Sequence, residues 1–253
     1  MQIETIREQL KLLRLPTASE GFESVLAERR IKSDFSWLST LLELELNARK
    51  ENALERRIKK ATFPERRCLE QFNWDFNKKI DREKIEELAT CRFVEKNEIA
   101  LFLGSPGTGK THCAIAIGMR AAQLGHSIFC SSVKRLSSRI RIARERNTLD
   151  QLFKQILVAK LWILDDWGVV TMPRDVSEEV FDLFDRRKAN SAMILTSNRD
   201  VEEWPQVFSD PILANAAIDR MFEQAKIVIF EGPSYRMKGR IIMQDVDIEK
   251  HQE

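Results

Sequence analysis

The chain has 253 residues, of which 43% are hydrophobic and 32% are charged, a balance typical of a globular protein with a packed core. The formal net charge is only +2, which excludes a strong global attraction to nucleic acid, so such a partner would have to be met by local basic patches. No apolar run approaches the roughly 20 residues of a membrane span, and the first residues lack a leader pattern, so we expect a cytoplasmic protein without membrane contact.

Residues 1–66 are predicted to form a small all-α domain that binds DNA or a partner. Apolar residues recur there at helical spacing, and Pro16 and residues 32–34 mark breaks between three helices. The third helix ends in a dense basic cluster. The cations of this cluster are Arg56, Arg57, Lys59 and Lys60. A solvated helix face and a surface that contacts DNA phosphates explain it equally well.

Residues 67–80 are interpreted as a linker. Its aromatic stretch, residues 72–76, is expected to pack on the main domain, and the alternative is that it lines an adenine pocket. Residues 81–96 are predicted to form a short amphipathic helix that leads into the first strand of the main domain, which spans residues 81–253.

The main domain opens with a strand, a glycine-rich loop and a helix. Residues 104–111 follow the apolar run 99–103 and satisfy the pattern G-x-x-x-x-G-K-[ST], in which backbone N–H groups hold phosphates, the lysine reaches the β and γ phosphates and the hydroxyl ligates Mg²⁺. A coincidental glycine-rich turn is the alternative. The predicted binding residues are Gly104, Pro106, Gly107, Thr108, Gly109, Lys110 and Thr111.

Alternation of strands and helices continues after this loop and predicts an α/β fold. Gly125 ends the first helix, residues 127–130 form a strand, and an apolar stripe then marks a second helix. Basic residues flank that stripe on both sides. They are Lys134, Arg135, Arg139, Arg141, Arg144 and Arg146. We favour contact with DNA over the alternative that these long side chains only cover the apolar face.

Two acids end the next buried strand, residues 161–164. Asp165 is predicted to hold Mg²⁺ through water, opposite Thr111, and Asp166 to orient or deprotonate the attacking water. A helix cap followed by a turn is the structural alternative. Parallel strands of this kind bind ligands at their carboxyl ends, which favours the catalytic interpretation.

Polar residues also end the strand at residues 193–195. Asn198 suits a sensor that hydrogen-bonds the attacking water or the γ-phosphate, and an Asx turn is the alternative. The guanine-reading pattern N-K-x-D is absent after it. A helix over residues 213–222 carries Arg220, which has no acid at position 216 and whose simplest role is a surface pair with Asp219 or Glu223.

Together these segments resemble the AAA+ ATPases of the initiator and helicase-loader branch, and within it the IstB-like helper ATPases of bacterial insertion sequences. The resemblance runs nearly from end to end. It rests on residues 10–15, 43–49, 56–61, 104–111, 161–168, 195–198, 210–214, 217–221 and 232–236.

The resemblance implies a P-loop AAA+ three-layer sandwich with a parallel sheet, preceded by the all-α domain. Only 23 residues follow Phe230, so the usual helical lid is expected to be minimal or absent. Lys110, Thr111 and Asp165 would bind ATP and Mg²⁺. Arg220 looks like an arginine finger for the neighbouring subunit and Arg236 like a second sensor, which implies a homo-oligomer, either a ring or a helical filament.

By the same resemblance, the chain is expected to be a DNA-stimulated ATPase that helps a transposase capture or remodel double-stranded target DNA. Many AAA+ proteins carry Glu in place of Asp166, and the shorter acid predicts slower hydrolysis. The alternatives are a replicative helicase loader and an ATP-gated DNA-coating module with little hydrolysis.

Overall fold

The structure, a computed structural model, describes residues 2–28, 34–187, 190–222 and 225–237. These residues divide into two compact units, residues 1–59 and 60–253. Each unit has a core of its own.

The first unit is helical. It consists of α1 (Gln2–Leu12), α2 (Pro16–Glu28) and α3 (Ser36–Ala61), the last two residues of α3 belonging to the second unit. Ile6, Leu10 and Leu42 are buried in its core, and Gln9 donates a hydrogen bond to the carbonyl of Ser39, which fixes α1 against α3. The three predicted helices are confirmed, with breaks where Pro16 and the polar residues near 34 were expected.

The second unit is an α/β fold with a five-stranded parallel sheet in the order β2-β3-β4-β1-β5. Its strands are β1 (Ile99–Gly104), β2 (Ile128–Ser132), β3 (Leu161–Trp167), β4 (Ala192–Ser197) and β5 (Lys226–Phe230). Its helices are α4 (Arg82–Ala89), α5 (Arg92–Glu95), α6 (Lys110–Gln123), α7 (Val133–Glu145), α8 (Leu149–Leu157), α9 (Arg174–Arg187) and α10 (Pro211–Phe222).

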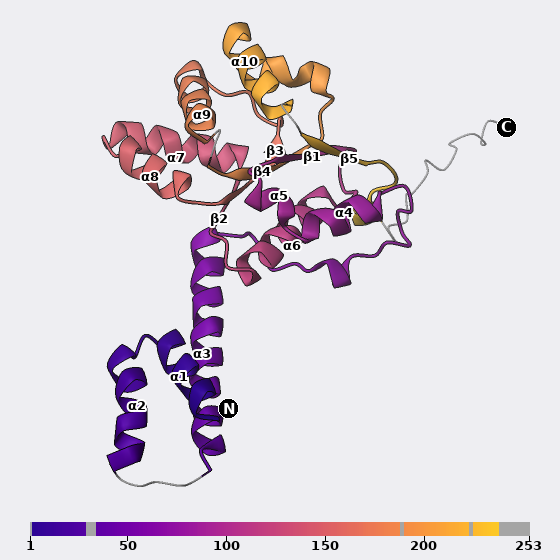
Figure 1. The fold of residues 1–253 in the computed structure, drawn as a ribbon. Coiled ribbons are helices and arrows are strands. Elements are labelled where there is room, and N and C mark those ends of the chain that lie inside the picture. Colours follow the sequence, from indigo (N-terminus) through magenta and orange to yellow (C-terminus); the bar gives the residue numbers. More distant parts are fainter. Residues whose placement is uncertain (1, 29–33, 188–189, 223–224, 238–253) are drawn as a thin grey trace, which may run out of the picture. The chain divides into compact units, whose positions relative to one another are not determined.

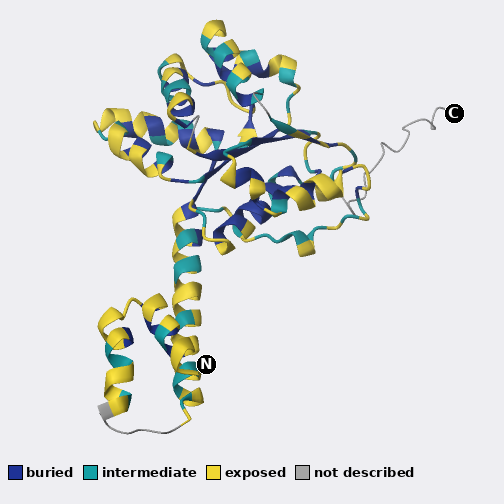
Figure 2. Ribbon diagram, viewed as in Figure 1, coloured by how far each residue is buried: buried dark blue, intermediate teal, exposed yellow. Residues whose placement is uncertain are grey.

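Helices cover both faces of this sheet. In Figure 1, helices α7 to α10 lie on one side of the strands and α4 to α6 on the other. Figure 2 shows buried residues along the strands and on the helix faces that meet them. The central strands are buried on both sides because each face packs against helices, and their sequences are therefore almost wholly apolar. The predicted three-layer sandwich is confirmed.

One local feature differs from the sequence expectation. Residues 81–96 form two helices, α4 and α5, because Cys91 takes a left-handed conformation (φ 60°) between them. Residues 67–80, the predicted linker, form an irregular segment with turns at residues 74–76 and 78–79 and one short 3₁₀ helix, Leu69–Gln71. Two further 3₁₀ helices, Val201–Val207 and Tyr235–Met237, follow β4 and β5.

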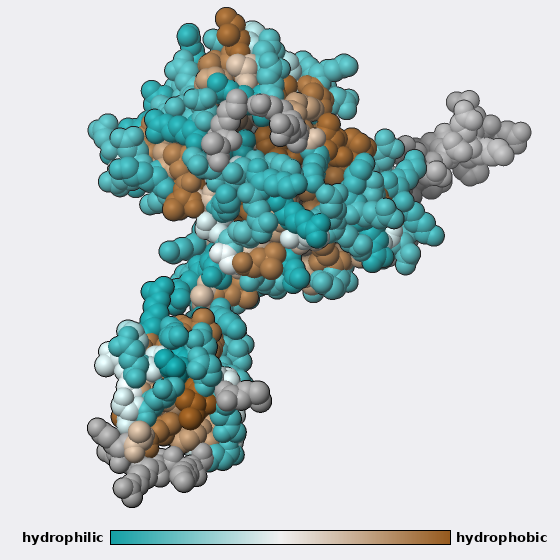
Figure 3. All heavy atoms as spheres, in the orientation of Figure 1, coloured by the Kyte–Doolittle hydropathy of each residue, from teal (hydrophilic) through white to brown (hydrophobic). Residues whose placement is uncertain are grey.

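The surface is mostly hydrophilic on the face drawn in Figure 3, with hydrophobic residues in separate patches. Within the described ranges, no helix combines the length and the apolar character that a membrane span requires.

Candidate nucleotide-binding site

The phosphate loop lies between β1 and α6, and three of its glycines adopt positive φ angles. Gly104, Gly107 and Gly109 have φ of 133°, 76° and 107°. At Gly104 a Cβ would lie 2.3 Å from the carbonyl oxygen of Phe230, so β5 approaches the loop at backbone distance. A side chain at these positions would strain the loop and fill the space beside it, which explains the glycines.

Thr108 and Lys110 are the buried side chains of the loop. Lys110 is 5% exposed, and its ammonium donates hydrogen bonds to the carbonyls of Gly104 and Ser105 at 2.7 and 2.6 Å. Burial lowers the pKa of Lys110 to about 8, although the nearby carboxylates of Asp166 and Asp165 favour its charged form. The two carbonyls are neutral, so an anion would compensate the positive charge of this buried ammonium more fully. The Lys110 side chain is therefore suited to bind a phosphate group.

The two acids predicted at the end of β3 lie in different surroundings. Asp165 accepts a hydrogen bond from the hydroxyl of Thr111 at 2.8 Å, as expected for a hydroxyl and a carboxylate that share one cation. Its Oδ1 also accepts from the hydroxyl of Thr196 at 2.6 Å. Asp166 is exposed toward the pocket and takes a left-handed conformation, with φ of 59°.

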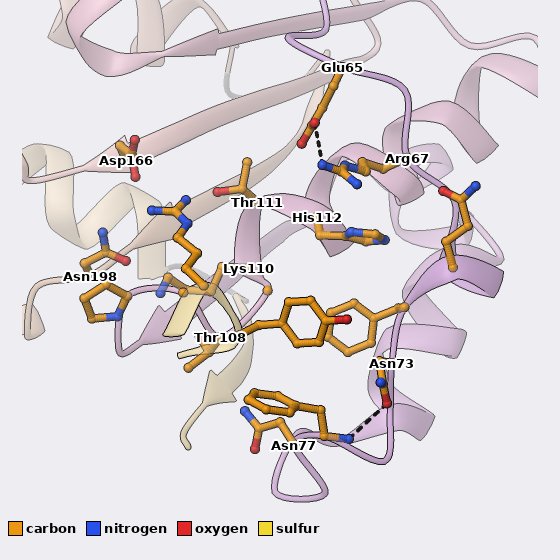
Figure 4. A pocket seen from close by; sticks show the side chains of 18 of the residues that line it. Glu65, Arg67, Asn73, Asn77, Thr108, Lys110, Thr111, His112, Asp166 and Asn198 are labelled. Atoms are coloured by element: carbon orange, nitrogen blue, oxygen red, sulfur yellow. Dashed lines mark hydrogen bonds and ion pairs between the residues drawn. The ribbon is translucent and has the colours of Figure 1, made fainter. Parts of the chain in front are cut away.

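A pocket of about 520 Å³ adjoins the loop and brings together most of the predicted nucleotide-binding and catalytic residues, although Gly104 and Asp165 do not line it. In Figure 4, Asp166 and Asn198 lie near Lys110, while Asn73 and Asn77 lie at the other end. Burial and the adjacent charge of Asp165 raise the pKa of the Asp166 carboxyl, and Arg236 and Lys110 act against this rise. Such a carboxylate is a better proton acceptor than an ordinary surface acid.

The segment after β5 completes one side of this pocket. The N–H of Tyr235 donates to the carbonyl of Gly107 at 2.9 Å, and Arg236 lines the pocket beside it. A Cβ at Gly107 would lie 2.1 Å from the hydroxyl oxygen of Ser234. The short segment therefore fits directly against the phosphate loop.

The opposite side is built by the predicted linker. Its aromatic residues Phe72 and Phe76 line the pocket, and Phe76 stands edge-on to Tyr235 with the ring centroids 4.9 Å apart. Asn77 is 4% exposed, and its amide nitrogen has no hydrogen-bond partner. The aromatics were expected chiefly to pack; they pack and also form a wall of the pocket.

Arg220 does not reach this pocket. It lies on α10, where its guanidinium forms an ion pair with Asp185 of α9 at 2.9 Å and covers the ring of Phe181 at 4.5 Å from the centroid. The expected surface pair was with Asp219 or with Glu223, which lies outside the described residues. The partner is on α9 because α9 and α10 pack against each other.

The predicted DNA-binding residues are not among the residues that line the pocket, and they differ in exposure and contacts. Arg56, Lys59 and Lys60 are exposed near the end of α3, and Arg57 is half-buried. On α7 and at the residue that follows it, the exposed cations are Lys134, Arg135, Arg141, Arg144 and Arg146. Two of the basic side chains of α7 contact a ring or a carboxylate of another element. Arg139 covers Phe129 at 5.5 Å from the ring centroid, and Arg144 pairs with Glu179 at 3.5 Å.

For several pocket residues, no motif in the sequence would have predicted that they line the pocket. Gln71, Asn77 and Tyr235 line the pocket from segments far from the phosphate loop in the chain. Thr196 could have been found from the sequence, since it begins the polar run at the end of β4, although Asn198 is the more obvious candidate in that run.

The donor set fits a nucleoside triphosphate with Mg²⁺. The loop offers a cradle that Cβ atoms would fill, a buried ammonium whose hydrogen bonds go to two neutral carbonyls, and a hydroxyl paired with a carboxylate. Together with the parallel sheet order, these features define a P-loop protein of the AAA+ class.

Comparison with known proteins supports this class and identifies the family. AMPPCP-bound DnaA from Aquifex aeolicus aligns with a TM-score of 0.57 at 22% identity, covering 70% of this chain and 54% of that one. The DnaC helicase loader gives 0.52 at 19% identity, covering 59% and 87%. A Pseudomonas aeruginosa protein of insertion sequence IS21, named as ATP-binding, is 35% identical over 242 residues, 94% of this chain and 90% of that protein. The family of IstB-like ATP binding proteins matches residues 5–242, and the chain belongs to it.

Proposed function

We propose that this chain is an oligomeric, Mg²⁺-dependent ATPase that helps a transposase capture or remodel double-stranded target DNA. The observation that best supports the ATPase activity is that one pocket beside the phosphate loop is lined by Lys110, Asp166, Asn198 and Arg236. The insertion-sequence names of its relatives support the transposition role.

In the proposed reaction each side chain has a separate task. The Lys110 ammonium leaves the loop carbonyls and binds the β and γ phosphates. Asp166 accepts a proton from the attacking water, and Asn198 hydrogen-bonds that water or the γ-phosphate. Thr111 and Asp165 would hold Mg²⁺, which supplies charge neutralisation at the phosphates. The raised pKa of the Asp166 carboxyl supports its task as a base.

We assign the base of the nucleotide to the other end of the pocket. Phe72, Phe76 and Tyr235 offer aromatic surface there, and an adenine ring stacks on such faces. The side-chain amide nitrogen of the buried Asn77, which has no partner among the described residues, can donate a hydrogen bond in the same region. Recognition of ATP would therefore bring together three segments, residues 65–77, residues 104–111 and residues 235–236.

We assign DNA contact to the two basic clusters. Exposed lysines and arginines bind DNA phosphates without recognising the base sequence. The exposed cations of α7 and of the end of α3 are suited to such contacts. The small net charge of the chain supports a local rather than a global attraction.

The test measures ATP hydrolysis by the full chain with Mg²⁺, with and without duplex DNA. We expect the wild type to hydrolyse ATP faster with duplex DNA, and Lys110→Ala to lose hydrolysis in both conditions. A preference for single-stranded DNA would favour a helicase loader. Equally long-lived DNA complexes with ATP and with a non-hydrolysable analogue would favour a DNA-coating module and contradict the proposal.

A further inference from the structure

One buried hydroxyl connects the two acids of the site. Thr196 lies near the end of β4 and is 1% exposed. Its hydroxyl donates to Asp165 Oδ1 at 2.6 Å and accepts a hydrogen bond from the backbone N–H of Asp166 at 3.1 Å. A hydroxyl has one hydrogen to donate, so this hydrogen and one lone pair are both committed to β3.

The strand that Thr196 contacts is irregular at this place. Pairing between β3 and β4 runs regularly to Leu164 opposite Leu195 and resumes with Trp167 opposite Ser197, so the two acids form a bulge of β3. Asp166 has φ of 59° within that bulge. A left-handed conformation costs about 1–2 kcal/mol for a residue with a Cβ, and it persists only where neighbouring groups hold it.

The N–H of Asp166 would be an unpaired donor in a bulge of this kind, because it is turned out of the sheet pairing. The Thr196 hydroxyl supplies its partner. The same oxygen is thereby held at a fixed distance from the Asp165 carboxylate, whose Oδ1 also accepts from Thr111. The branched side chain of threonine has few χ1 conformations, which makes it a stiff connector.

We propose that Thr196 is a positioning residue that sets both acids at once, Asp165 for the cation and Asp166 for the attacking water. This inference rests on the proposed ATPase function. Thr196 does not line the pocket; it acts through the side chain of Asp165 and the backbone of Asp166. One hydrogen-bonded hydroxyl therefore couples cation binding to the orientation of the base.

The experiment compares Thr196→Val, which keeps the shape and removes the hydroxyl, with Thr196→Ser, which keeps the hydroxyl. Thr196→Ala is a second hydroxyl-free variant in case the valine is not accommodated. Ser191→Ala is the matched control: Ser191 is 1% exposed just before the other end of β4, and its hydroxyl donates to the carbonyl of Ala159 at 2.7 Å, away from the pocket.

The first measurement needs no nucleotide. Hydrogen exchange at the Asp166 amide, followed by NMR, is expected to be at least tenfold faster in the hydroxyl-free variants and unchanged in Thr196→Ser and Ser191→Ala. Equal exchange in all proteins would overturn the proposed hydrogen bond.

The second measurement compares binding of a fluorescent ATP analogue with Mg²⁺ and with EDTA, together with kcat and KM. Loss of the hydroxyl is expected to leave binding in EDTA unchanged and to reduce the Mg²⁺-dependent gain in affinity and kcat by about 10–100-fold, as for other partners that orient metal ligands. Thr196→Ser should restore both. If the hydroxyl-free variants behave as Ser191→Ala does, the positioning role is wrong.

Failure of the proposed function would look different. In that case the wild type itself would show neither a Mg²⁺-dependent gain in nucleotide affinity nor hydrolysis that Lys110→Ala abolishes.

Discussion

At the scale of single residues, the phosphate loop depends on glycine for two separate reasons. Gly107 and Gly109 have positive φ, and each also lies where a Cβ would meet a side chain from a distant segment, Ser234 or Phe72. Both the loop conformation and the packing of the pocket walls therefore require these glycines.

Replacing Gly107 with alanine should impair both properties. A left-handed conformation and a Cβ placed 2.1 Å from Ser234 are expected to lower the free energy of unfolding by about 1–2 kcal/mol and ATP affinity by about tenfold or more. Urea unfolding and titration with a fluorescent ATP analogue measure the two effects. Gly21→Ala is the control, because Gly21 lies within α2 with nothing within 4 Å of its Cβ position, and it should raise stability by about 0.5–1 kcal/mol. Equal effects of the two substitutions would contradict the argument.

The cysteines allow a second prediction at this scale. Burial raises the pKa of Cys91 to about 11 and that of Cys130 to about 12, and it also raises the pKa of Cys113. A thiol with a pKa near 11 is only about 0.1% thiolate at pH 8, and the thiolate is the reactive form. Cys68 is half-buried. A disulfide reagent at pH 8 should therefore modify one thiol quickly in the native protein and all four in urea; rapid modification of two or more in the native protein would be inconsistent with this burial.

At the scale of elements, the two sides of α7 differ: one side packs in the core and the other is largely basic. Leu136, Ile140 and Ala143 are buried against the sheet, and the exposed positions are largely basic. Within that basic surface, Arg139 covers Phe129 and the exposed Arg144 pairs with Glu179. Arg135 and Arg141 are exposed and have no ion pair or ring contact with the described residues. Helix α7 therefore contains exposed cations that are candidates for DNA contact. It also contains Arg144, which serves as a comparison because its side chain is held by other groups of the chain.

We expect Arg135→Ala and Arg141→Ala each to weaken duplex binding uniformly across sequences and to reduce the salt dependence of log K by about 1. Arg144→Ala should change DNA binding less, because its side chain is held by Glu179 and by the backbone carbonyl of Asp175. Fluorescence anisotropy with labelled duplexes over a range of salt measures both quantities. An unchanged salt slope in the first two variants would exclude these residues from the DNA interface.

At the scale of the whole molecule, Arg220 belongs outside the pocket of its own chain. It is paired with Asp185 on α9, and it could act as an arginine finger only on the nucleotide of a neighbouring subunit. This placement agrees with the proposed homo-oligomer, since Arg236 lines the pocket and Arg220 does not.

This assignment predicts complementation between inactive variants. Arg220→Ala should lower hydrolysis about 10³-fold or more, and Lys110→Ala should abolish it. Mixing the two with duplex DNA should restore activity, because an Arg220→Ala subunit keeps Lys110 and its Lys110→Ala neighbour supplies Arg220. Steady-state phosphate release measures the recovery. Full activity of a monomeric Arg220→Ala protein, or no recovery in a mixture that still assembles, would refute a finger in trans.

The sequence by itself determined the fold class and the position of the phosphate loop. Apolar runs that end in glycines or acids predict parallel strands with ligands at their carboxyl ends, and the spacing of residues 104–111 is local, so both were read without a structure. The family resemblance was confirmed for the same reason, since its motifs are short and contiguous.

Only the tertiary structure decided which distant side chains meet at the site. Phe76 and Tyr235 are far apart in the chain, and they become neighbours because the segments before β1 and after β5 both reach the phosphate loop. The partner of Arg220 was likewise set by the packing of α9 against α10. The role of Thr196 arises from a bulge in β3, and a bulge depends on the pairing of two strands, which no single stretch of sequence encodes.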